Sequence, residues 1–389
     1  MFKNFVFHIY SLFIVLLFLA DCCGNKSNAT YAENYPILID IKEAMRNQVN
    51  FKYSDILFDS ITFIPIESII GSYITSLDGT LLRFTSNYIF AENYFNGGEL
   101  VCYNRNGKFI RKVAQRGRGP GEFSDISDIA IDEKNEIVYV LCTSGIRIFK
   151  YSFQGKFIEL IYLTHPADRI IVNSENQLLV HFPNWGGDLQ YSCLLLDNKG
   201  NTINKLKNNI FYSLNDKRKF WKKEGLFYIY NDQIHIKDKC DTLFVVENDQ
   251  FIPKYIFSTG ENHSNKLSQL EYDRKVSINY IHETESKIFF QFGINKIGYI
   301  AYYDKKIGKA FSTTREIIND MYDRQSIYLS MFTYQYNDEI IMRNNSFDMV
   351  TLKKNVSTSK YLEISNMLDA LKDEDPVILS ILHLKKINN

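Results

Sequence analysis

The sequence predicts an all-β protein, a six-bladed β-propeller whose ring is closed by strands from both chain ends. Three observations carry this prediction: a turn-plus-strand unit that returns every 45 to 50 residues, strand-like segments between its copies, and an aromatic content of 15%. A period of this size suits one four-stranded blade per repeat. Aromatic side chains favour pleated, half-buried surfaces, so the composition agrees with a large β core.

The recurring unit is clearest in two copies, Asn106-Gly107-Lys108-Phe109-Ile110 and Gln154-Gly155-Lys156-Phe157-Ile158, with a weaker copy at Lys199-Gly200-Asn201-Thr202-Ile203. The glycine spacings are 48 (155 minus 107) and 45 (200 minus 155). Asn248-Asp249-Gln250-Phe251-Ile252 and Ile307-Gly308-Lys309 resemble degenerate copies. Each copy predicts a tight turn that leads into a strand.

Strand signals between the copies delimit the blades. The first clear blade contains strands predicted at Thr80 to Phe84, Tyr88 to Glu92, Glu99 to Tyr103 and Phe109 to Val113. The next spans Ile126 to Leu163 and includes the continuous apolar run Ile137 to Cys142, which is typical of a strand buried on both faces. Later blades are predicted at Ile170 to Lys205, Phe227 to Phe257 and Val276 to Phe311, and a sixth begins within Tyr328 to Leu352.

Ring closure is expected to come from the chain ends. Ile61 to Ile66 has the pattern of a first strand and Val377 to Leu384 that of a last strand, and we expect them in one blade. Between the sixth blade's start and the last strand, Ile364, Met367, Leu368 and Leu371 share one face of a short predicted helix that ends before Asp375-Pro376.

The first 22 residues have the pattern of a signal peptide. Lys3 is the only charge before a mostly apolar run from Phe5 to Ala20, which is short for a membrane span. Leu19-Ala20-Asp21-Cys22 resembles a bacterial lipoprotein processing box and makes Cys22 the predicted lipid anchor, although Asp21 is unusual there. Cys23 is a second candidate, and a simple secreted protein or an uncleaved anchor stays open.

Three segments follow from this pattern: a signal peptide at 1–22, a tether and leading segment at 23–52, and a propeller domain at 53–389. The expected location is the cell envelope, as a periplasmic or outer-membrane lipoprotein. With 45 basic and 45 acidic residues, the chain has no general field that would attract nucleic acid or an acidic membrane surface. We therefore expect membrane contact only through the lipid, and no nucleic-acid partner.

Metal-ligand spacing is absent from the sequence. Cys102, Cys142, Cys193 and Cys240 are spread one to a repeat, which favours buried cysteines and leaves a disulfide unassigned. The histidines after the predicted signal peptide are His165, His181, His235, His263, His282 and His383. None of them stands at a metal-ligand spacing from another. A propeller channel can nevertheless gather metal ligands from separate blades.

The segment Gln115-Arg116-Gly117-Arg118-Gly119-Pro120-Gly121-Glu122-Phe123 resembles a family of secreted bacterial six-bladed β-propeller lipoproteins related to NHL-repeat propellers. Ser54-Asp55-Ile56 with Ile64-Pro65-Ile66-Glu67, Asp128 to Asp132 with Val138 to Leu141, and Glu374 to Leu379 are similar to other parts of that family. The resemblance implies the fold and an exported location. It implies no shared reaction.

The glycine-rich loop at 117–121 lacks the lysine and hydroxyl residue of a phosphate-binding loop and the spacing of a dinucleotide site. A tight connection between blades explains its glycines and Pro120. The alternative is that Arg116 and Arg118 line one mouth of the central channel and bind an anionic group, because the planar guanidinium pairs well with carboxylate or phosphate.

Other candidates are also weighed against structural roles. Asp128 shares a strand side with Asp132 and could meet a cation or ligand near the axis, although ending strands and capping turns is the simpler role for Asp125, Asp128 and Asp132. Trp185 is expected in a blade-tip loop, where an exposed indole can stack on a sugar or an apolar partner. Trp221 is expected to pack at the start of a strand.

These patterns favour a binding or interaction module whose ligand is an unknown small molecule, a glycan or an envelope protein. No catalytic residue, metal or cofactor is assigned, and no Gly-x-Ser-x-Gly elbow exists. The alternative is a metal-dependent, lactonase-like hydrolase that uses carboxylates in the central channel to hold a cation. A structural partner in an envelope complex is a third hypothesis.

Overall fold

The computed structural model describes residues 36–52, 58–67, 81–93, 98–259, 276–314, 334–345 and 377–384, apart from residues 143, 145, 185, 209–224, 239 and 338. The predicted signal peptide with Cys22, the residues Trp185, Trp221 and His263, and the short helix expected around residues 364–371 lie outside these described residues.

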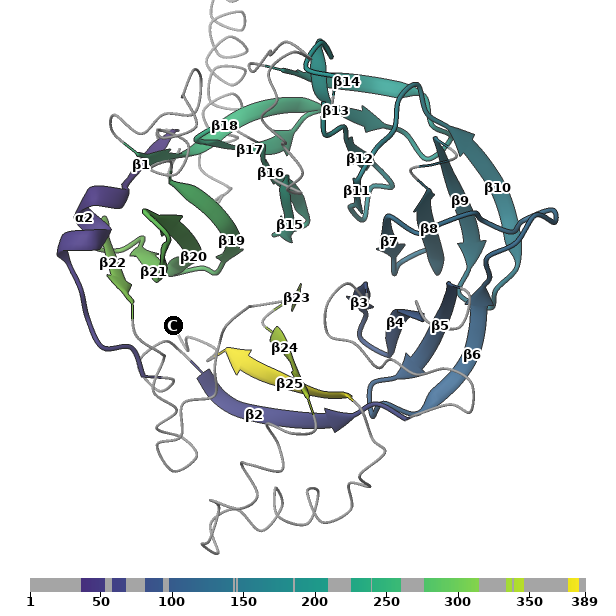
Figure 1. The fold of residues 1–389 in the computed structure, drawn as a ribbon, viewed down its shortest axis with the longest axis horizontal. Coiled ribbons are helices and arrows are strands. Elements are labelled where there is room, and N and C mark those ends of the chain that lie inside the picture. Colours follow the sequence, from purple (N-terminus) through teal and green to yellow (C-terminus); the bar gives the residue numbers. More distant parts are fainter. Residues whose placement is uncertain are drawn as a thin grey trace, which may run out of the picture. The chain divides into compact units, whose positions relative to one another are not determined.

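Six four-stranded antiparallel units form a ring around a central opening (Figure 1). Blade 1 contains β3 (Leu82–Phe84), β4 (Tyr88–Asn93), β5 (Glu99–Asn104) and β6 (Phe109–Ala114), from the inside outward. Blade 2 contains β7 (Asp128–Asp132), β8 (Ile137–Cys142), β9 (Arg147–Ser152) and β10 (Phe157–Tyr162). Blade 3 contains β11 (Arg169–Val172), β12 (Leu178–His181), β13 (Tyr191–Leu196) and β14 (Thr202–Lys207).

Blade 4 contains β15 (Leu226–Tyr230), β16 (Gln233–Lys237), β17 (Thr242–Glu247) and β18 (Gln250–Ser258). Blade 5 contains β19 (Ser277–Glu283), β20 (Lys287–Ile294), β21 (Ile297–Asp304) and β22 (Lys309–Thr313). Blade 6 contains β23 (Tyr334–Tyr336), β24 (Glu339–Asn345), β25 (Val377–Leu384) and β2 (Phe58–Pro65). The predicted six-bladed propeller is confirmed.

The chain ends close the ring as expected. The last strand, β25, pairs with β2 in antiparallel register, so that Ile61 lies opposite Leu382 and Ile64 opposite Leu379. On its other side β25 pairs with β24. Blade 6 is therefore completed by its outer strand from the beginning of the domain, which joins the two ends of the sequence by a ladder of main-chain hydrogen bonds.

The recurring glycines occupy equivalent turns, each between the third and fourth strands of a blade. Gly107, Gly155 and Gly200 have φ angles of +78°, +88° and +88°, in the left-handed region that glycine adopts without strain. A β-carbon on Gly107 would collide with the carbonyl oxygen of Pro65, and one on Gly200 with the side chain of Ile161. The repeat therefore marks places where each turn packs against the outer strand of the preceding blade.

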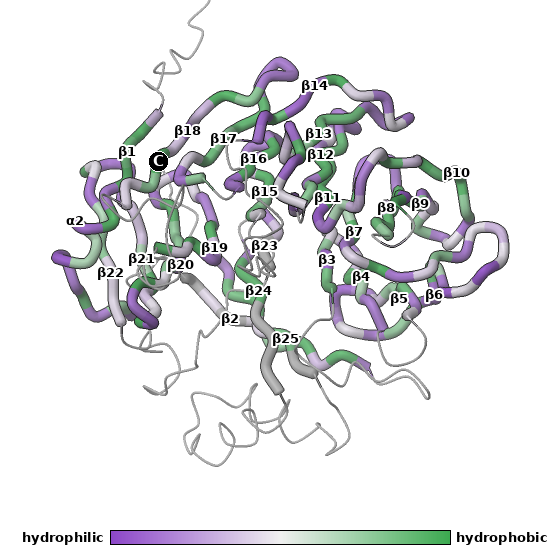
Figure 2. Tube along the Cα trace, turned by 45° about the horizontal axis from the view of Figure 1, so that its top comes forward, coloured by the Kyte–Doolittle hydropathy of each residue, from purple (hydrophilic) through white to green (hydrophobic). Residues whose placement is uncertain are grey.

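The core consists of apolar layers between neighbouring blades. Between blades 1 and 2, for example, the fully buried Phe90 and Cys102 pack with Ile129 and Val138. Figure 2 shows the hydrophobic residues along the blade strands and the hydrophilic ones in the turns. Cys102, Cys142 and Cys193 are buried and free, and Cys240 is partly buried and free, as the predicted packing role requires.

The predicted leading segment contributes two elements to the folded domain. β1 (Ile37–Asp40) pairs with β18 and makes a fifth strand on blade 4. The helix α2 (Ile41–Arg46) follows at once, with the Asp40 side chain accepting a hydrogen bond from the Lys42 amide as its N-cap. Ser312 of β22 donates to the Ala44 carbonyl oxygen at 2.7 Å, so the helix is fastened to blade 5.

The two ends of the blades differ. Connections from first to second and from third to fourth strand are tight turns at one end, which we call the turn end. Connections from second to third strand, and the links to the next blade, lie at the opposite end, which we call the loop end. Among the described residues, the long connections at this end are 115–127 and, apart from residue 185, 182–190. Binding residues concentrate on such loops when a rigid scaffold holds them.

Candidate functional site

The link between blades 1 and 2 is closed by its own hydrogen bonds. The Gly117 amide donates to the carbonyl oxygen of Phe123 at 2.9 Å. The Glu122 carboxylate accepts from the side chain of Gln115 and from the Gly119 amide, each at 2.7 Å. These bonds, led by the one from Gln115, hold the pKa of Glu122 below its ordinary value. The glycine-rich loop is thus a fixed platform, and Figure 1 shows this link reaching outward past β10.

Gly121 allows the loop to lie directly on the outer part of blade 2. Its φ is +74°, and a β-carbon there would come within 2.9 Å of the Phe157 side chain. The Tyr151 hydroxyl donates to the Gly121 carbonyl oxygen at 2.8 Å and fastens the loop in place. The structural role expected for these glycines is therefore the observed one.

A pocket of about 350 Å³ lies between this loop and the outer strands β9 and β10; we call it the outer pocket. Its lining combines the loop backbone with apolar side chains, two arginines and one carboxylate: Gly117 to Glu122, Ser124, Arg147, Phe149, Phe157 and Leu160. Phe149 is buried, whereas Arg118 and Arg147 are exposed. This composition suits a ligand with an apolar body and an anionic group.

The two pocket arginines keep their guanidinium groups available. Arg147 lies over the Tyr162 ring, with its guanidinium carbon 5.8 Å from the ring centroid. Within the part of the chain that the structure describes, neither Arg118 nor Arg147 forms an ion pair. The Glu122 carboxylate of the lining is hydrogen-bonded to Gln115 and the Gly119 amide, so an arriving carboxylate or phosphate would meet two guanidinium groups without a described ion pair.

The structure brings Arg118 to the outer pocket, whereas the expectation put it with Arg116 at the mouth of the central channel. Arg118 lines the outer pocket beside β9 and β10, on the far side of blade 2 from the channel. Arg116 is exposed, is not part of the pocket lining, and packs its aliphatic stem near Gly98. The loop turns outward because Gly121 can approach Phe157. Ligand binding by Arg116 and Arg118 remains a prediction.

Asp128 is buried among the inner strands and engaged on both oxygens. One oxygen pairs with Arg83 of β3 and accepts from the Ile129 amide, and the other accepts from the Ile170 amide of β11 at 3.0 Å. Asp128 thus joins blades 1, 2 and 3. Asp132 accepts from the backbone and side chain of Asn135 in the adjoining turn. These contacts favour the structural role for both carboxylates, and ligand binding by Asp128 remains untested.

A buried Asp–His–Asp arrangement joins blades 3 and 4 near the loop end. His181 is 1% exposed and bonds through Nδ1 to Asp168 at 2.6 Å and through Nε2 to Asp238 at 3.1 Å. Burial of the ring acts to lower the pKa of His181, but the hydrogen bonds that the ring donates to the two carboxylates outweigh it and raise that pKa to about 9. Since both ring nitrogens are occupied, His181 is an ionic link between blades and has no nitrogen left to activate a nucleophile.

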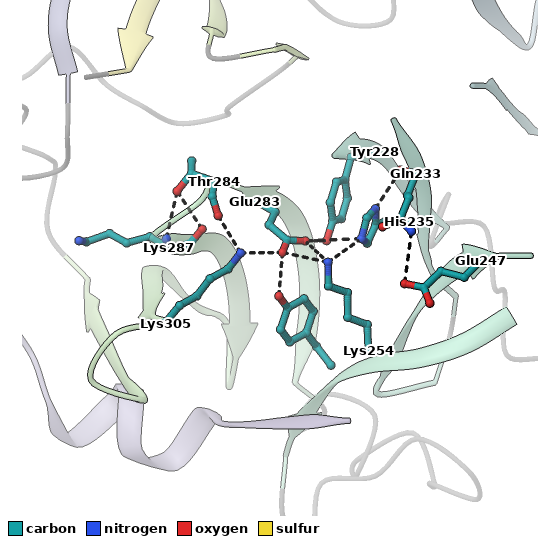
Figure 3. A network of polar contacts seen from close by, with 10 residues as sticks. Tyr228, Gln233, His235, Glu247, Lys254, Glu283, Thr284, Lys287 and Lys305 are labelled. Carbon is teal, nitrogen blue, oxygen red and sulfur yellow. Dashed lines mark hydrogen bonds and ion pairs between the residues drawn. The ribbon is translucent and has the colours of Figure 1, made fainter. Parts of the chain in front are cut away.

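A network of polar contacts lies between blades 4 and 5, around Glu283 (Figure 3). Its carboxylate is completely buried and accepts from the hydroxyls of Tyr255 at 2.7 Å and Tyr228 at 2.9 Å. Lys305 and Lys254 approach it at 2.7 and 3.2 Å. Burial acts to raise the pKa of Glu283, but the two ammonium groups outweigh it and lower that pKa to about 2.

His235 completes this cluster as a neutral ring. Burial and the neighbouring Lys254 lower the pKa of His235 to about 4. Its Nδ1 donates to the Gln233 carbonyl oxygen at 3.0 Å, and its Nε2 accepts from Lys254 at 3.0 Å. Every nitrogen and oxygen described here has a protein partner. The cluster is therefore a polar seam between two blades, and it leaves no group directed at a ligand.

The sequence did not point to Arg147 or Glu283, and it gave His181 only as one of six histidines without a partner. Arg147 stands in an ordinary strand pattern, and only the folding of the preceding link over blade 2 brings it beside Arg118. His181 and Glu283 each end a strand, and some of their partners, such as Asp238 and Tyr255, come from another blade. The described residues contain no group of three or more His, Cys, Asp or Glu arranged to hold a metal ion.

Comparison with known proteins identifies the family. The model of a family described as a domain of unknown function, DUF4934, matches residues 36–383. The chain belongs to the DUF4934 family. No curated protein matches the sequence. Among the described residues, no helix is long and apolar enough to cross a membrane.

Solved structures with the same architecture include an exported protein of Bacteroides fragilis NCTC 9343. It is 16% identical to this DUF4934 chain, with a TM-score of 0.67 over 90% of this chain and 99% of the other. A member of the DUF4221 family from Bacteroides vulgatus has a TM-score of 0.47 and 8% identity, over 85% of this chain and 98% of the other. At such identities the first likeness shows the fold alone. Membership in an NHL-like lipoprotein family remains a prediction.

Proposed function

We propose that this DUF4934 chain is an exported, lipid-anchored binding module of the cell envelope, and that it binds an anionic ligand in the outer pocket. The observation that supports this proposal best is the pairing of Arg118 and Arg147 over apolar side chains in a pocket whose loop is held closed by its own hydrogen bonds. A preformed site of this kind loses little entropy when it binds.

The chemistry of the pocket defines the ligand class. Arginine can hold a carboxylate or phosphate by two parallel hydrogen bonds, and the exposed parts of Phe157 and Leu160 offer apolar contact beside it. A ligand that carries one anionic group on an apolar or aromatic body fits both features. Among the ligand classes expected from the sequence, this favours a small molecule or the acidic part of an envelope protein over a neutral glycan.

Export and anchoring are supported by the sequence of the first 22 residues. An apolar run and the Leu19-Ala20-Asp21-Cys22 box precede the described domain. The Bacteroides fragilis protein with the same fold is described as exported. A propeller held by one lipid at Cys22 would stay at a membrane surface through its anchor, without a basic patch.

The metal-dependent hydrolase gains no support from the described carboxylates. Asp128 is committed to Arg83 and two backbone amides, and Asp168 and Asp238 are committed to His181. A cation would have to displace these partners. We therefore keep binding as the proposed function.

Binding is tested by thermal unfolding with a panel of benzoate, decanoate, succinate and phosphate. We expect at least one apolar carboxylate to raise the melting temperature of the wild-type protein, because a ligand that binds only the folded state stabilises it. Arg118→Gln with Arg147→Gln should abolish the shift. Arg116→Gln is the matched control, since Arg116 belongs to the same loop but does not line the pocket. A shift that survives the double substitution would refute the assignment.

Anchoring is tested by metabolic labelling with an alkynyl fatty acid in a bacterial host that processes lipoproteins. Cys22→Ser should abolish the label, and Cys23→Ser should leave it unchanged. A label that persists in Cys22→Ser and disappears in Cys23→Ser would move the anchor by one residue. The absence of label from the wild-type protein would contradict lipid anchoring and leave the pocket proposal intact.

A further inference from the structure

The outer strands of the blades differ in what covers them. In blade 4 the chain itself supplies a fifth strand, because β1 pairs with the outer edge of β18. In blade 5, α2 and the residues after it lie against β22, where Ser312 bonds to Ala44 and Asn47. Blades 1, 2, 3 and 6 end in β6, β10, β14 and β2, and no described strand pairs with their outer edges. Some outer strands of the propeller are therefore covered by another segment of the chain, whereas others have an unpaired outer edge in the described structure.

Of the open edges, β6 and β14 carry lysine or arginine and β2 ends in Pro65, whereas β10 has neither. Its one charged residue, Glu159, is paired with Lys150 of β9 at 2.7 Å. β6 carries Arg111 and Lys112, and β14 carries Lys205 and Lys207. Lysine and arginine on an edge strand are common devices against unwanted pairing. β10 reads Phe-Ile-Glu-Leu-Ile-Tyr, without lysine, arginine or proline, and is mostly hydrophobic in Figure 2. Such a strand has a high tendency to pair.

β10 also exposes its apolar side chains to an unusual degree. Phe157 is 37% exposed, Ile158 45% and Tyr162 71%. A bulge interrupts its pairing with β9 between Phe157 and Glu159. This bulge does not exclude strand addition, because β18 contains a comparable irregularity opposite Leu243 and Phe244 and still accepts β1.

The edge is continuous with the outer pocket. Phe157 and Leu160 belong to β10 and line the pocket, and Arg147 pairs with Tyr162 at the other end of the strand. A new strand that paired with β10 would therefore direct some of its own side chains toward the guanidinium groups of Arg118 and Arg147. Neither arginine has an ion-pair partner among the described residues. Charge complementarity then requires an acidic side chain or a terminal carboxylate in that strand.

We propose that β10 binds an extended segment of a partner protein as a fifth strand of blade 2, with an acidic side chain of that segment in the outer pocket. This rests on the proposed function, because it uses the same arginines. Main-chain hydrogen bonds to the open edge supply affinity, and the pocket selects the acidic residue, which is how β-strand addition usually divides the two tasks. Four residues suffice for such a strand, since β1 itself spans Ile37–Asp40.

The test begins with capture of peptides from a pool by the immobilised full chain, read by mass spectrometry. In the pool, Val, Ile or Thr alternates with variable residues, and one position is Asp. We expect captured peptides to protect the amides of residues 157–162 from hydrogen exchange. The same peptides with Asn for Asp should bind more weakly, and peptides with N-methylated main chains, which cannot donate to the edge, should not bind.

Substitutions place the peptide on the strand. Ile158→Lys adds a blocking charge to β10 without touching the pocket lining, and we expect at least tenfold weaker binding. Ile203→Lys is the matched control, because Ile203 holds the equivalent place in the repeat on β14 and is 38% exposed. It should leave peptide binding unchanged. In both variants, carboxylates should raise the melting temperature as much as they do in the wild-type protein.

Each alternative has its own signature. If carboxylates stabilise the protein but N-methylated peptides bind as well as the unmodified ones, strand addition is refuted and the pocket proposal survives. If neither carboxylates nor peptides bind, both fail. If the chain self-associates in solution and Ile158→Lys makes it monomeric, the occupant is a second copy of this chain, and the partner assignment is overturned.

Discussion

The carbonyl oxygen of Val113 lies 2.9 Å from the point that a β-carbon on Gly155 would occupy. Val113 ends the outer strand of blade 1, and Gly155 is in the last turn of blade 2, so one blade is seated directly on the turn of the next. The same relationship joins Pro65 to Gly107 and Ile161 to Gly200. The sequence repeat therefore reflects a contact that recurs between neighbouring blades, in which the glycine turn of one blade packs against the outer strand of the preceding blade.

Gly155→Ala should destabilise the protein by about 2 kcal/mol, because alanine would have to adopt a φ near +88° and push against the neighbouring backbone. Gly298→Ala is the control, since nothing lies within 4 Å of its added β-carbon. That variant should be neutral or slightly more stable. Denaturant unfolding of both variants checks this, and equal losses would contradict this packing between blades.

Glu283→Gln should cost about 3–5 kcal/mol, because it leaves the buried Lys254 and the partly buried Lys305 without their counter-charge. Glu99→Gln removes one partner of the more exposed pair with Lys112 and should cost less than about 1 kcal/mol. Chemical unfolding at neutral pH compares the two. If Glu283→Gln lowers the free energy of unfolding no more than Glu99→Gln does, the polar cluster between blades 4 and 5 contributes little to stability.

His181 should make the protein less stable in alkaline solution. Its pKa is raised from 6.5 to about 9 in the folded state, so its favourable contribution is complete below pH 6.5 and is lost as the pH rises through about 9. The difference in unfolding free energy between the wild-type protein and His181→Asn should shrink by about 3 kcal/mol across that window. A constant difference, or a histidine that titrates near 6.5 by NMR, would contradict the ionic link.

Removal of divalent metal should leave the protein unchanged. The described carboxylates near the inner strands are bonded to protein groups, and we expect a metal-free mass for protein purified without chelator. Native mass spectrometry measures this directly. A stoichiometric divalent ion that chelator removes would instead favour the hydrolase hypothesis and justify a screen of lactones and esters.

The ring could be predicted from the sequence because its determinants are local and repeated. The turn glycines, the continuous apolar run Ile137 to Cys142 and the strand pattern of Val377 to Leu384 each act within one segment. The closing pair β2 and β25 followed from the requirement that a ring must close. β1 was missed because four residues before a short helix carry too little pattern to indicate an edge strand.

The candidate site could be predicted only in part. The sequence drew attention to Arg118 and its loop, but the direction of the loop depends on the contact between Gly121 and Phe157, which are far apart in the sequence. Arg147 and Tyr162 become neighbours only through pairing of β9 with β10. The pKa values of His181 and Glu283 are shifted by Asp168 and Lys305 of their own blades together with Asp238 and Lys254 of an adjacent blade, and no sequence spacing encodes those contacts.

The most direct measurement for the central claim is a crystal structure of the protein with the carboxylate that stabilises it most. We predict the anionic group between Arg118 and Arg147, with the apolar body against Phe157 and Leu160. A ligand bound in the central channel or on the turn end, with the outer pocket empty, would contradict the account.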